Sequence, residues 1–245
     1  MSLEFIILSD SKGCLLSLAL SSLICVSGKV MMLNTIIVDT YTIVNMQKII
    51  FIHGANCSPV IWNYLAPKIK GKRDFIRYDT SVPFKENLES LKQDLSRFDN
   101  SIIVAHSMGG LYAAHIVNAI GQDHIKAVVT ISTPFNGSEK ANQMSMFFPE
   151  YQMLRDVASN SKPVTHTQDI LATVHIPWLQ IVSTKGHVPL MSDPNDGVVT
   201  INSQEYIKNL KYVELEYNHF EILLNEDTAG VINEFISGLD QPAVV

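Results

Sequence analysis

The sequence predicts an α/β fold in which a mostly parallel sheet is covered by helices on both faces. From residue 47 onward, short apolar runs alternate with stretches that carry apolar residues at helical spacing. Strand, helix and strand in this order indicate parallel strands joined by crossover helices. Apolar residues make up 47% of the 245 residues and charged residues 17%, a composition typical of a folded globular domain that excludes a disordered chain.

The expected strands are short runs of apolar and β-branched residues. Some of them, such as 48–52 and 101–105, are almost continuously apolar, as parallel strands covered on both faces are. In chain order the expected strands are residues 48–52, 74–78, 101–105, 127–132, 178–183 and 211–217.

The expected helices lie between these strands. Leu88, Leu91 and Leu95 share one helical face, and Gly121 can end the helix that follows the third strand. In chain order the expected helices are residues 59–69, 85–98, 111–120 and 221–236.

The chain is expected to divide into an N-terminal extension, residues 1–45, and one domain, residues 46–245. Met46 begins a strand-like run and would be a natural start for that domain. Within the domain, the long interruption of the alternation predicts a small helical, lid-like insertion after the fourth strand, at about 138–172.

Residues 13–28 of the extension bear on where the protein is expected to be located. This stretch of sixteen residues carries no charge; it is short for a transmembrane helix of about 20 residues and resembles the apolar region of a signal peptide. Glu4 and Asp10 offset Lys12, whereas a signal peptide has a positive amino end. We expect a cytoplasmic protein, with export or membrane anchoring through this segment as the alternative.

Two further expectations concern the extension. Residues 13–28 can also be interpreted as a buried hydrophobic helix, or as an upstream extension of the reading frame. Residues 33–45 are rich in β-branched side chains and are expected to form one or two edge strands. Membrane contact is expected only through the N-terminal segment.

Charge and cysteine content exclude several classes of protein. Lys and Arg total 18 and Asp and Glu total 24, a net charge of −6 that argues against nucleic acid as a partner. Three cysteines without CxxC spacing do not make a disulfide framework or a zinc site. The histidines show no metal-binding spacing, so we expect no metal and no cofactor.

Ser107 is the candidate nucleophile. It lies in Ala105-His106-Ser107-Met108-Gly109-Gly110, after a strand and before a helix, which is the context of a nucleophile elbow. Ala105 and Gly109 are small, so that strand and helix can approach closely. The alternative is that Ser107 only caps the helix in an ordinary strand-to-helix turn.

A catalytic serine needs a base, and the base needs a carboxylate that orients it. His219 follows the last expected strand, and the preceding loop holds Asp193 and Asp196. Asp196 is favoured because Gly-Val-Val follows it and suits a turn into a packed segment. The alternatives are that His219 is only a surface residue and that Asp193 and Asp196 only form a turn.

Two backbone amides are expected to form the oxyanion hole. Met108 follows the nucleophile, and the loop after the first strand offers Ala55 as first choice, with Asn56 next. His53 is expected to order this loop through hydrogen bonds. His106 is expected to be a packing residue that points away along the turn, and Cys57 a small buried thiol.

The order of these segments resembles the α/β-hydrolase superfamily over about residues 48–238, in particular its lipase and esterase branch. His-Gly-Ala at 53–55 resembles the oxyanion motif, and residues 105–110 resemble the elbow, with Ala105 in place of the usual Gly. Residues 131–138 and 218–220 resemble further segments of the same branch. Dehalogenase and epoxide-hydrolase relatives carry aspartate at the elbow, where this chain has a serine.

The resemblance implies a serine hydrolase that cleaves a small-molecule or lipid carboxylic ester through an acyl-enzyme, with Ser107, Asp196 and His219 as its triad. Acyl transfer, thioester hydrolysis and a non-catalytic binding module are the alternatives. The expected substrate-contacting residues are His53, Asn56, Phe147 and Phe148. Met and aromatic residues in the insertion are expected to form a lid, or else to pack against the sheet.

Overall fold

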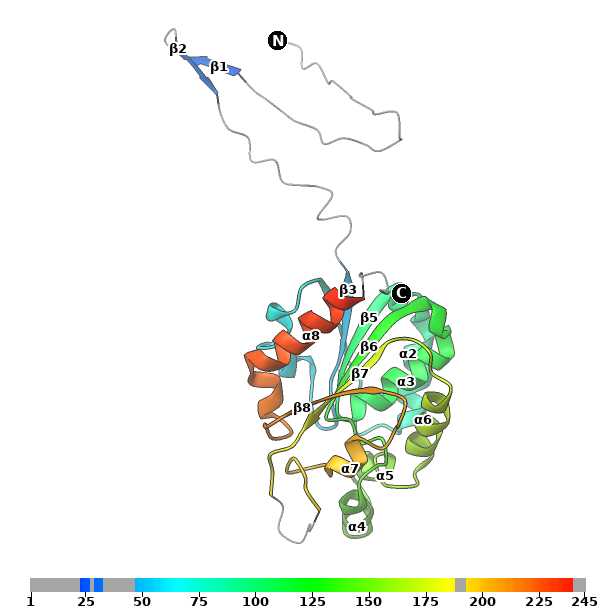
Figure 1. Ribbon diagram of the computed structural model, residues 1–245. Helices are drawn as coiled ribbons and strands as arrows, with labels where there is room; N and C mark the ends of the chain where they lie inside the picture. The colour runs from blue at the N-terminus through cyan, green and yellow to red at the C-terminus, as the bar shows by residue number, and fades with distance from the viewer. Residues whose placement is uncertain (1–22, 27–28, 33–46, 188–192, 240–245) are drawn as a thin grey trace, which may run out of the picture. The chain divides into compact units, whose positions relative to one another are not determined.

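A computed structural model describes residues 23–26, 29–32, 47–187 and 193–239 (Figure 1). The chain divides into two compact units, Met1–Met46 and Gln47–Val245. In the first unit, β1 (Leu23–Val26) and β2 (Lys29–Met32) form an antiparallel pair. The helical interpretation is therefore wrong for residues 23–26, whereas the edge strands expected at 33–45 lie outside the described residues.

The second unit is built on a six-stranded sheet in which every neighbouring pair is parallel. The strand order is β4-β3-β5-β6-β7-β8. The bounds are β3 (Lys48–Ile52), β4 (Lys72–Ile76), β5 (Ser101–His106), β6 (Ile125–Ile131), β7 (Trp178–Ser183) and β8 (Lys211–Leu215). The predicted fold class is confirmed, and all carboxyl ends of the strands lie at one edge of the sheet.

Alternate residues of the strands face two separate apolar cores, as a pleated strand dictates. Ile50 and Ile52 of β3 face the core under the helices α2 (Phe84–Leu91), α3 (Met108–Ile120) and α6 (Lys162–Ala172). Ile49 and Phe51 face the opposite core under α8 (Glu226–Gly238). Figure 1 shows α8 on one side of the sheet and α2, α3 and α6 on the other.

The expected helix at 59–69 is absent, and two short 3-10 helices take its place. They are η1 (Pro59–Trp62) and η2 (Ala66–Lys68). Pro67 explains the difference, because proline has no N–H to donate and its ring clashes with the preceding helical turn.

The expected helices at 85–98 and 221–236 are each divided. α2 ends at Leu91 and is followed by η3 (Lys92–Phe98), where Asp94 leaves the helical region and accepts a hydrogen bond from Ser96. Asn225 separates η5 (Glu221–Leu224) from α8 and caps α8 through the amide of Asp227. Side chains that bond locally thus compete with continuous helix.

The segment after β6 contains the expected small insertion. It forms α4 (Glu139–Phe147) and α5 (Gln152–Asp156), and then α6, which packs on α3 and covers the sheet. The short α7 (Ile201–Gln204) and η4 (Gln122–His124) complete the described helices. In Figure 1, α4, α5 and α7 lie at the end of the domain where the strands finish.

Two glycines let α3 lie close to its neighbours. A Cβ on Gly109 would lie 2.5 Å from the carbonyl oxygen of His53, and one on Gly110 would lie 2.1 Å from Oγ1 of Thr133. Neither position has room for a side chain unless the surroundings move.

We expect Gly110→Ala to lower the free energy of unfolding by about 1–3 kcal/mol through overpacking against Thr133. Chemical denaturation measures the change, and Gly230→Ala in α8 is the control, because nothing lies within 4 Å of its added Cβ. In a Thr133→Ala background, Gly110→Ala should lower the free energy of unfolding by a smaller amount. An equal decrease in the free energy of unfolding in both backgrounds would contradict the clash between Gly110 and Thr133.

Candidate active site

Ser107 occupies a strained turn between β5 and α3. Its φ of 53° and ψ of −125° lie in a region that non-glycine residues rarely adopt. The turn is held because the Ser107 amide donates to the carbonyl of Ile131 (2.8 Å) and the Thr133 hydroxyl donates to the carbonyl of Ser107 (3.1 Å). The Ser107 side chain makes no capping hydrogen bond to α3, so the geometry does not match the helix-cap alternative.

The hydroxyl of Ser107 instead faces His219. Oγ of Ser107 lies 3.0 Å from Nε2 of His219, and Nδ1 of His219 lies 2.7 Å from Oδ2 of Asp196. Asp196 is fully buried, and His219 and Ser107 are 3% and 8% exposed. The structure thus brings together the three residues expected to form a triad, and it places Asp196 rather than the exposed Asp193 against the histidine.

The carboxylate of Asp196 is surrounded by donors. Oδ1 accepts from the amides of Val198 (2.9 Å) and Val199 (2.7 Å), and Oδ2 accepts from Ser183 Oγ (2.5 Å) and Gln204 Nε2 (3.2 Å). Burial alone would raise the pKa of Asp196, but the hydrogen bonds from His219, Ser183 and Val199 lower it below its ordinary value. Asp196 therefore carries a negative charge at neutral pH.

Ser183 and Gln204 were not singled out from the sequence. Ser183 is the last residue of β7, and a polar side chain at the carboxyl end of a strand was an available signal. Gln204 lies in the short helix α7, and no local pattern marks it.

His106 lies against His219, so the expectation that it points away along the turn is wrong. It is fully buried, its Nε2 donates to the backbone carbonyl of His219 (2.9 Å), and the two imidazole rings are 4.8 Å apart. Burial is the main reason that the pKa of His106 falls to about 3. His106 is thus a neutral donor that holds the backbone of His219.

The loop after β3 lies against the elbow. A Cβ on Gly54 would be 3.0 Å from Cβ of Ser107. The amide of Asn56 donates to Oγ1 of Thr80 (3.1 Å), whereas the amide of Ala55 makes no hydrogen bond within the described residues. Met108 is the first residue of α3, so its amide has no partner inside the helix. Ala55 and Met108 therefore remain the candidate oxyanion donors.

His53 is placed to shape this loop. It is fully buried, its ring stacks on that of Tyr78 at 4.2 Å, and its Nδ1 donates to the carbonyl of Gly54 (2.9 Å). The hydroxyl of Tyr78 donates to the carbonyl of His53 (2.7 Å). The pKa of His53 is lowered, mainly by burial. Its contact with substrate stays a prediction, as does that of Asn56.

The aromatic residues of the insertion face outward. Phe147 is 79% exposed and Phe148 45%, and the neighbouring Met146 is 81% exposed. The expectation that these side chains pack against the sheet is therefore wrong for these residues. Their expected contact with substrate stays a prediction.

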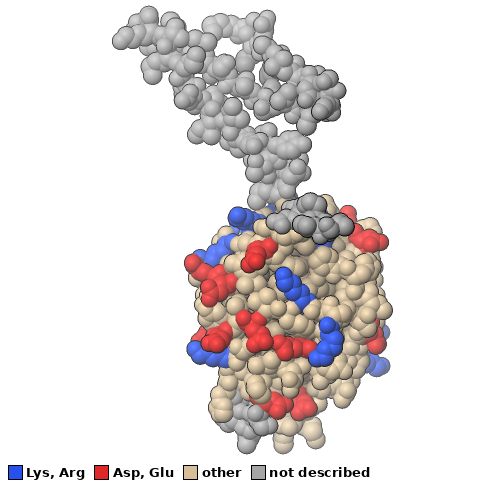
Figure 2. All heavy atoms as spheres, in the orientation of Figure 1, with Lys and Arg blue, Asp and Glu red and all other residues tan. Residues whose placement is uncertain are grey.

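Metal-binding and membrane-spanning features are not seen in the described parts of the chain. Within them, no group of three or more His, Cys, Asp and Glu side chains is arranged to hold a metal ion. No helix among those residues has the length and hydropathy required to span a bilayer. Cys57 is half-buried and free, and burial raises the pKa of its thiol. On the face seen in Figure 2, basic and acidic side chains are interspersed.

Comparison with solved structures identifies the fold. The chain is similar to a Bacillus licheniformis lipase, BlEst2 (18% identity, 79% of this chain and 92% of that chain covered, TM-score 0.63). It is also similar to the phospholipase PlaB of Legionella pneumophila (12% identity, 80% and 60% covered, TM-score 0.61). A haloalkane dehalogenase variant, DbeA-M1 of Bradyrhizobium elkanii, matches as well (14% identity, 80% and 90% covered, TM-score 0.59).

The chain has the α/β-hydrolase fold, which confirms the resemblance inferred from its sequence motifs. Within that class, residues 84–188 match the family model described as a PGAP1-like alpha/beta domain. No curated protein sequence matches the chain significantly.

The neutral, buried state of His106 predicts how stability depends on pH. The pKa is about 3 in the folded protein and 6.5 in an ordinary histidine, so between these values the unfolded chain binds a proton that the folded chain does not. Above pH 6.5 this contribution to stability is complete, and it is lost as the pH falls toward 3. We expect His106→Phe and His106→Gln to flatten the slope of unfolding free energy between pH 6 and 4 by about 1.4 kcal/mol per pH unit.

Denaturant unfolding of both variants over that pH range measures the slope. Gln can still donate to the carbonyl of His219. If this hydrogen bond positions His219, any hydrolysis of a p-nitrophenyl ester should be greater in His106→Gln than in His106→Phe. A wild-type slope in both variants would contradict the titration assigned to His106.

Proposed function

We propose that this protein is a serine hydrolase that cleaves carboxylic esters through an acyl-enzyme intermediate. The observation that carries the proposal is the buried line of hydrogen bonds from Ser107 Oγ through His219 to Asp196, with distances of 3.0 and 2.7 Å. This is the arrangement by which a histidine activates a serine while a carboxylate orients the imidazole.

In the proposed first step, Oγ of Ser107 attacks the ester carbonyl carbon and its proton passes to Nε2 of His219. The charge of Asp196 stabilises the imidazolium, and the amides of Ala55 and Met108 donate to the oxyanion. The C–O bond to the alcohol then breaks, and the leaving oxygen takes the proton from His219. Water that gives its proton to His219 attacks the acyl-enzyme, which releases the acid and restores Ser107.

A small-molecule or lipid ester is the proposed substrate class. Two similar structures are a lipase and a phospholipase, and the exposed Met146, Phe147 and Phe148 supply apolar surface at the end of the domain where the strands finish. A thioesterase or acyltransferase would use the same triad and differ only in the acyl donor or acceptor, so a thioester panel beside an ester panel separates these activities.

A fluorophosphonate probe tests the assignment of the nucleophile. We expect covalent labelling of Ser107 in the full chain, detected by peptide mass spectrometry, because His219 activates only this hydroxyl. Labelling and p-nitrophenyl ester hydrolysis should disappear in Ser107→Ala and persist in Ser237→Ala, a matched change on α8. Unlabelled wild-type protein would favour the non-catalytic binding module instead.

Asp196 and Asp193 provide a matched pair of substitutions. We expect Asp196→Asn to lower kcat for ester hydrolysis about 10⁴-fold, because an amide cannot hold His219 in the required tautomer. Asp193→Asn, in the same loop, should leave kcat within about twofold. Equal losses in the two variants would contradict the assignment of Asp196.

A further inference from the structure

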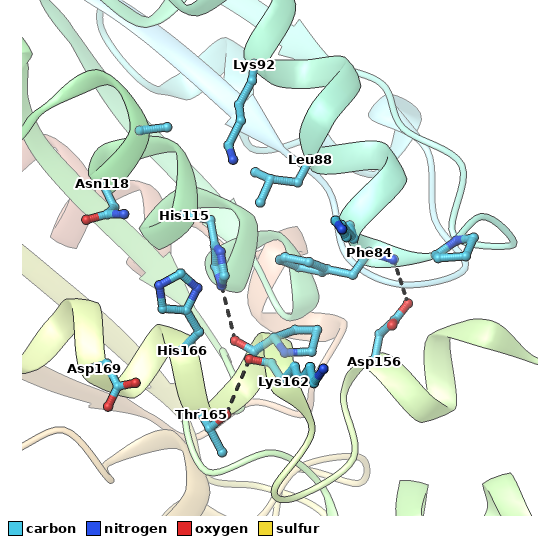
Figure 3. A pocket seen from close by; sticks show the side chains of 14 residues that line it. Phe84, Leu88, Lys92, His115, Asn118, Asp156, Lys162, Thr165, His166 and Asp169 are labelled. Atoms are coloured by element: carbon cyan, nitrogen blue, oxygen red, sulfur yellow. Dashed lines mark hydrogen bonds between the residues drawn. The ribbon is translucent and has the colours of Figure 1, made fainter.

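A cavity of about 630 Å³ lies in the helical layer away from the proposed triad. Three helix faces converge on it, as Figure 3 shows for Leu88, His115 and His166. Its residues recur at helical spacing: 85, 88 and 92 along α2 and η3, 115, 118 and 119 on α3, and 162, 165, 166 and 169 on α6. The volume is that of an ordinary small-molecule site.

The inner part of this cavity is apolar and uncharged. Phe84 and Leu88 are 3% and 7% exposed, and the half-buried Ala119 also lines the cavity. His115 is 6% exposed, its Nε2 donates to the carbonyl of Pro163 (3.2 Å), and burial is the main reason that its pKa falls to about 4. His115 is therefore neutral at pH 7, and the surface suits an aliphatic chain.

The rim of the cavity is basic. Lys85, Lys92 and Lys162 line it. Lys92 is paired with Glu89 (3.1 Å), whereas Lys85 and Lys162 make no ion pair with any described residue. Two ammonium groups beside an apolar cavity favour a ligand that carries an anionic group next to an apolar body.

The lining also holds two acidic residues, Asp156 and Asp169, so its lysines outnumber its carboxylates by three to two. The carboxylate of Asp156 is buried and engaged, because Oδ2 accepts from the amide of Phe84 (3.1 Å) and Oδ1 from Gln152 Nε2 (3.0 Å). Burial is also the main reason that its pKa is raised. Asp169 is seven residues beyond Lys162 on α6, about 10 Å along the helix axis.

We propose that this cavity binds an aliphatic anion, with its chain against Phe84, Leu88 and Ala119 and its head group held by Lys85 and Lys162. Carboxylate and alkyl phosphate head groups share this chemistry. The proposal concerns a site separate from the triad and holds whether or not the protein hydrolyses esters.

Isothermal titration calorimetry of the full chain with sodium octanoate tests the proposal, with Ser107→Ala used throughout to prevent turnover. We expect saturable binding that weakens about tenfold or more in Lys85→Glu/Lys162→Glu, because the head group loses both cations. The matched control is Lys126→Glu/Lys208→Glu, which reverses two exposed lysines outside the cavity and should bind within about twofold of the parent protein.

Three further arms complete the experiment. Ala119→Phe should weaken binding by filling the cavity, and octanol and octyltrimethylammonium should bind more weakly than octanoate. Octyl phosphate, compared with octanoate, shows which head group is preferred. Circular dichroism confirms that each variant is folded, and Lys85→Gln/Lys162→Gln replaces the charge reversal if that variant does not fold.

The proposal is overturned if octanoate does not bind, if the cavity variants bind as the control does, or if octanol binds as tightly as octanoate. Binding that survives Lys85→Glu/Lys162→Glu but is lost in Ala119→Phe would also overturn it, because the head group would then not be held by these lysines.

Discussion

A buried negative charge organises the carboxyl edge of the sheet. Asp196 has no exposed surface, and an ionised carboxylate there is stable only if donors replace the water that it has lost. Those donors come from Ser183 at the end of β7, from Gln204 on α7, from the amides after Asp196 itself and from His219 after β8. Segments distant in sequence are thus held in one arrangement, and His219 meets Ser107 as part of it.

A stack of aromatic rings links the loop after β3 to the cavity between α2, α3 and α6. His53 stacks on Tyr78 at 4.2 Å, Tyr78 contacts Tyr112 at 4.4 Å, and Tyr112 stacks on Phe84 at 4.0 Å. Phe84 lines the cavity, so a ligand there would touch the last ring of the stack. Because close-packed rings cannot shift independently, the position of His53 depends on side chains as distant as Phe84.

The sequence predicted what depends on local periodicity and on strand order. Residues 178–183 were expected as a strand and are one, because a continuous apolar run with strand length has few alternatives. Ser107, Asp196 and His219 were expected together because the carboxyl ends of parallel strands share one edge. The role of His106 depends on a contact across 113 residues, and the cavity on the packing of three helices, so neither had a local signal.

Three histidines near the elbow have different surroundings. His53 and His106 are fully buried with lowered pKa values, and each commits a ring nitrogen to a backbone carbonyl. His219 alone of the three has a carboxylate on one nitrogen and the serine hydroxyl on the other. Burial thus keeps the imidazoles of His53 and His106 neutral as structural donors, whereas His219 contacts both a carboxylate and the serine hydroxyl.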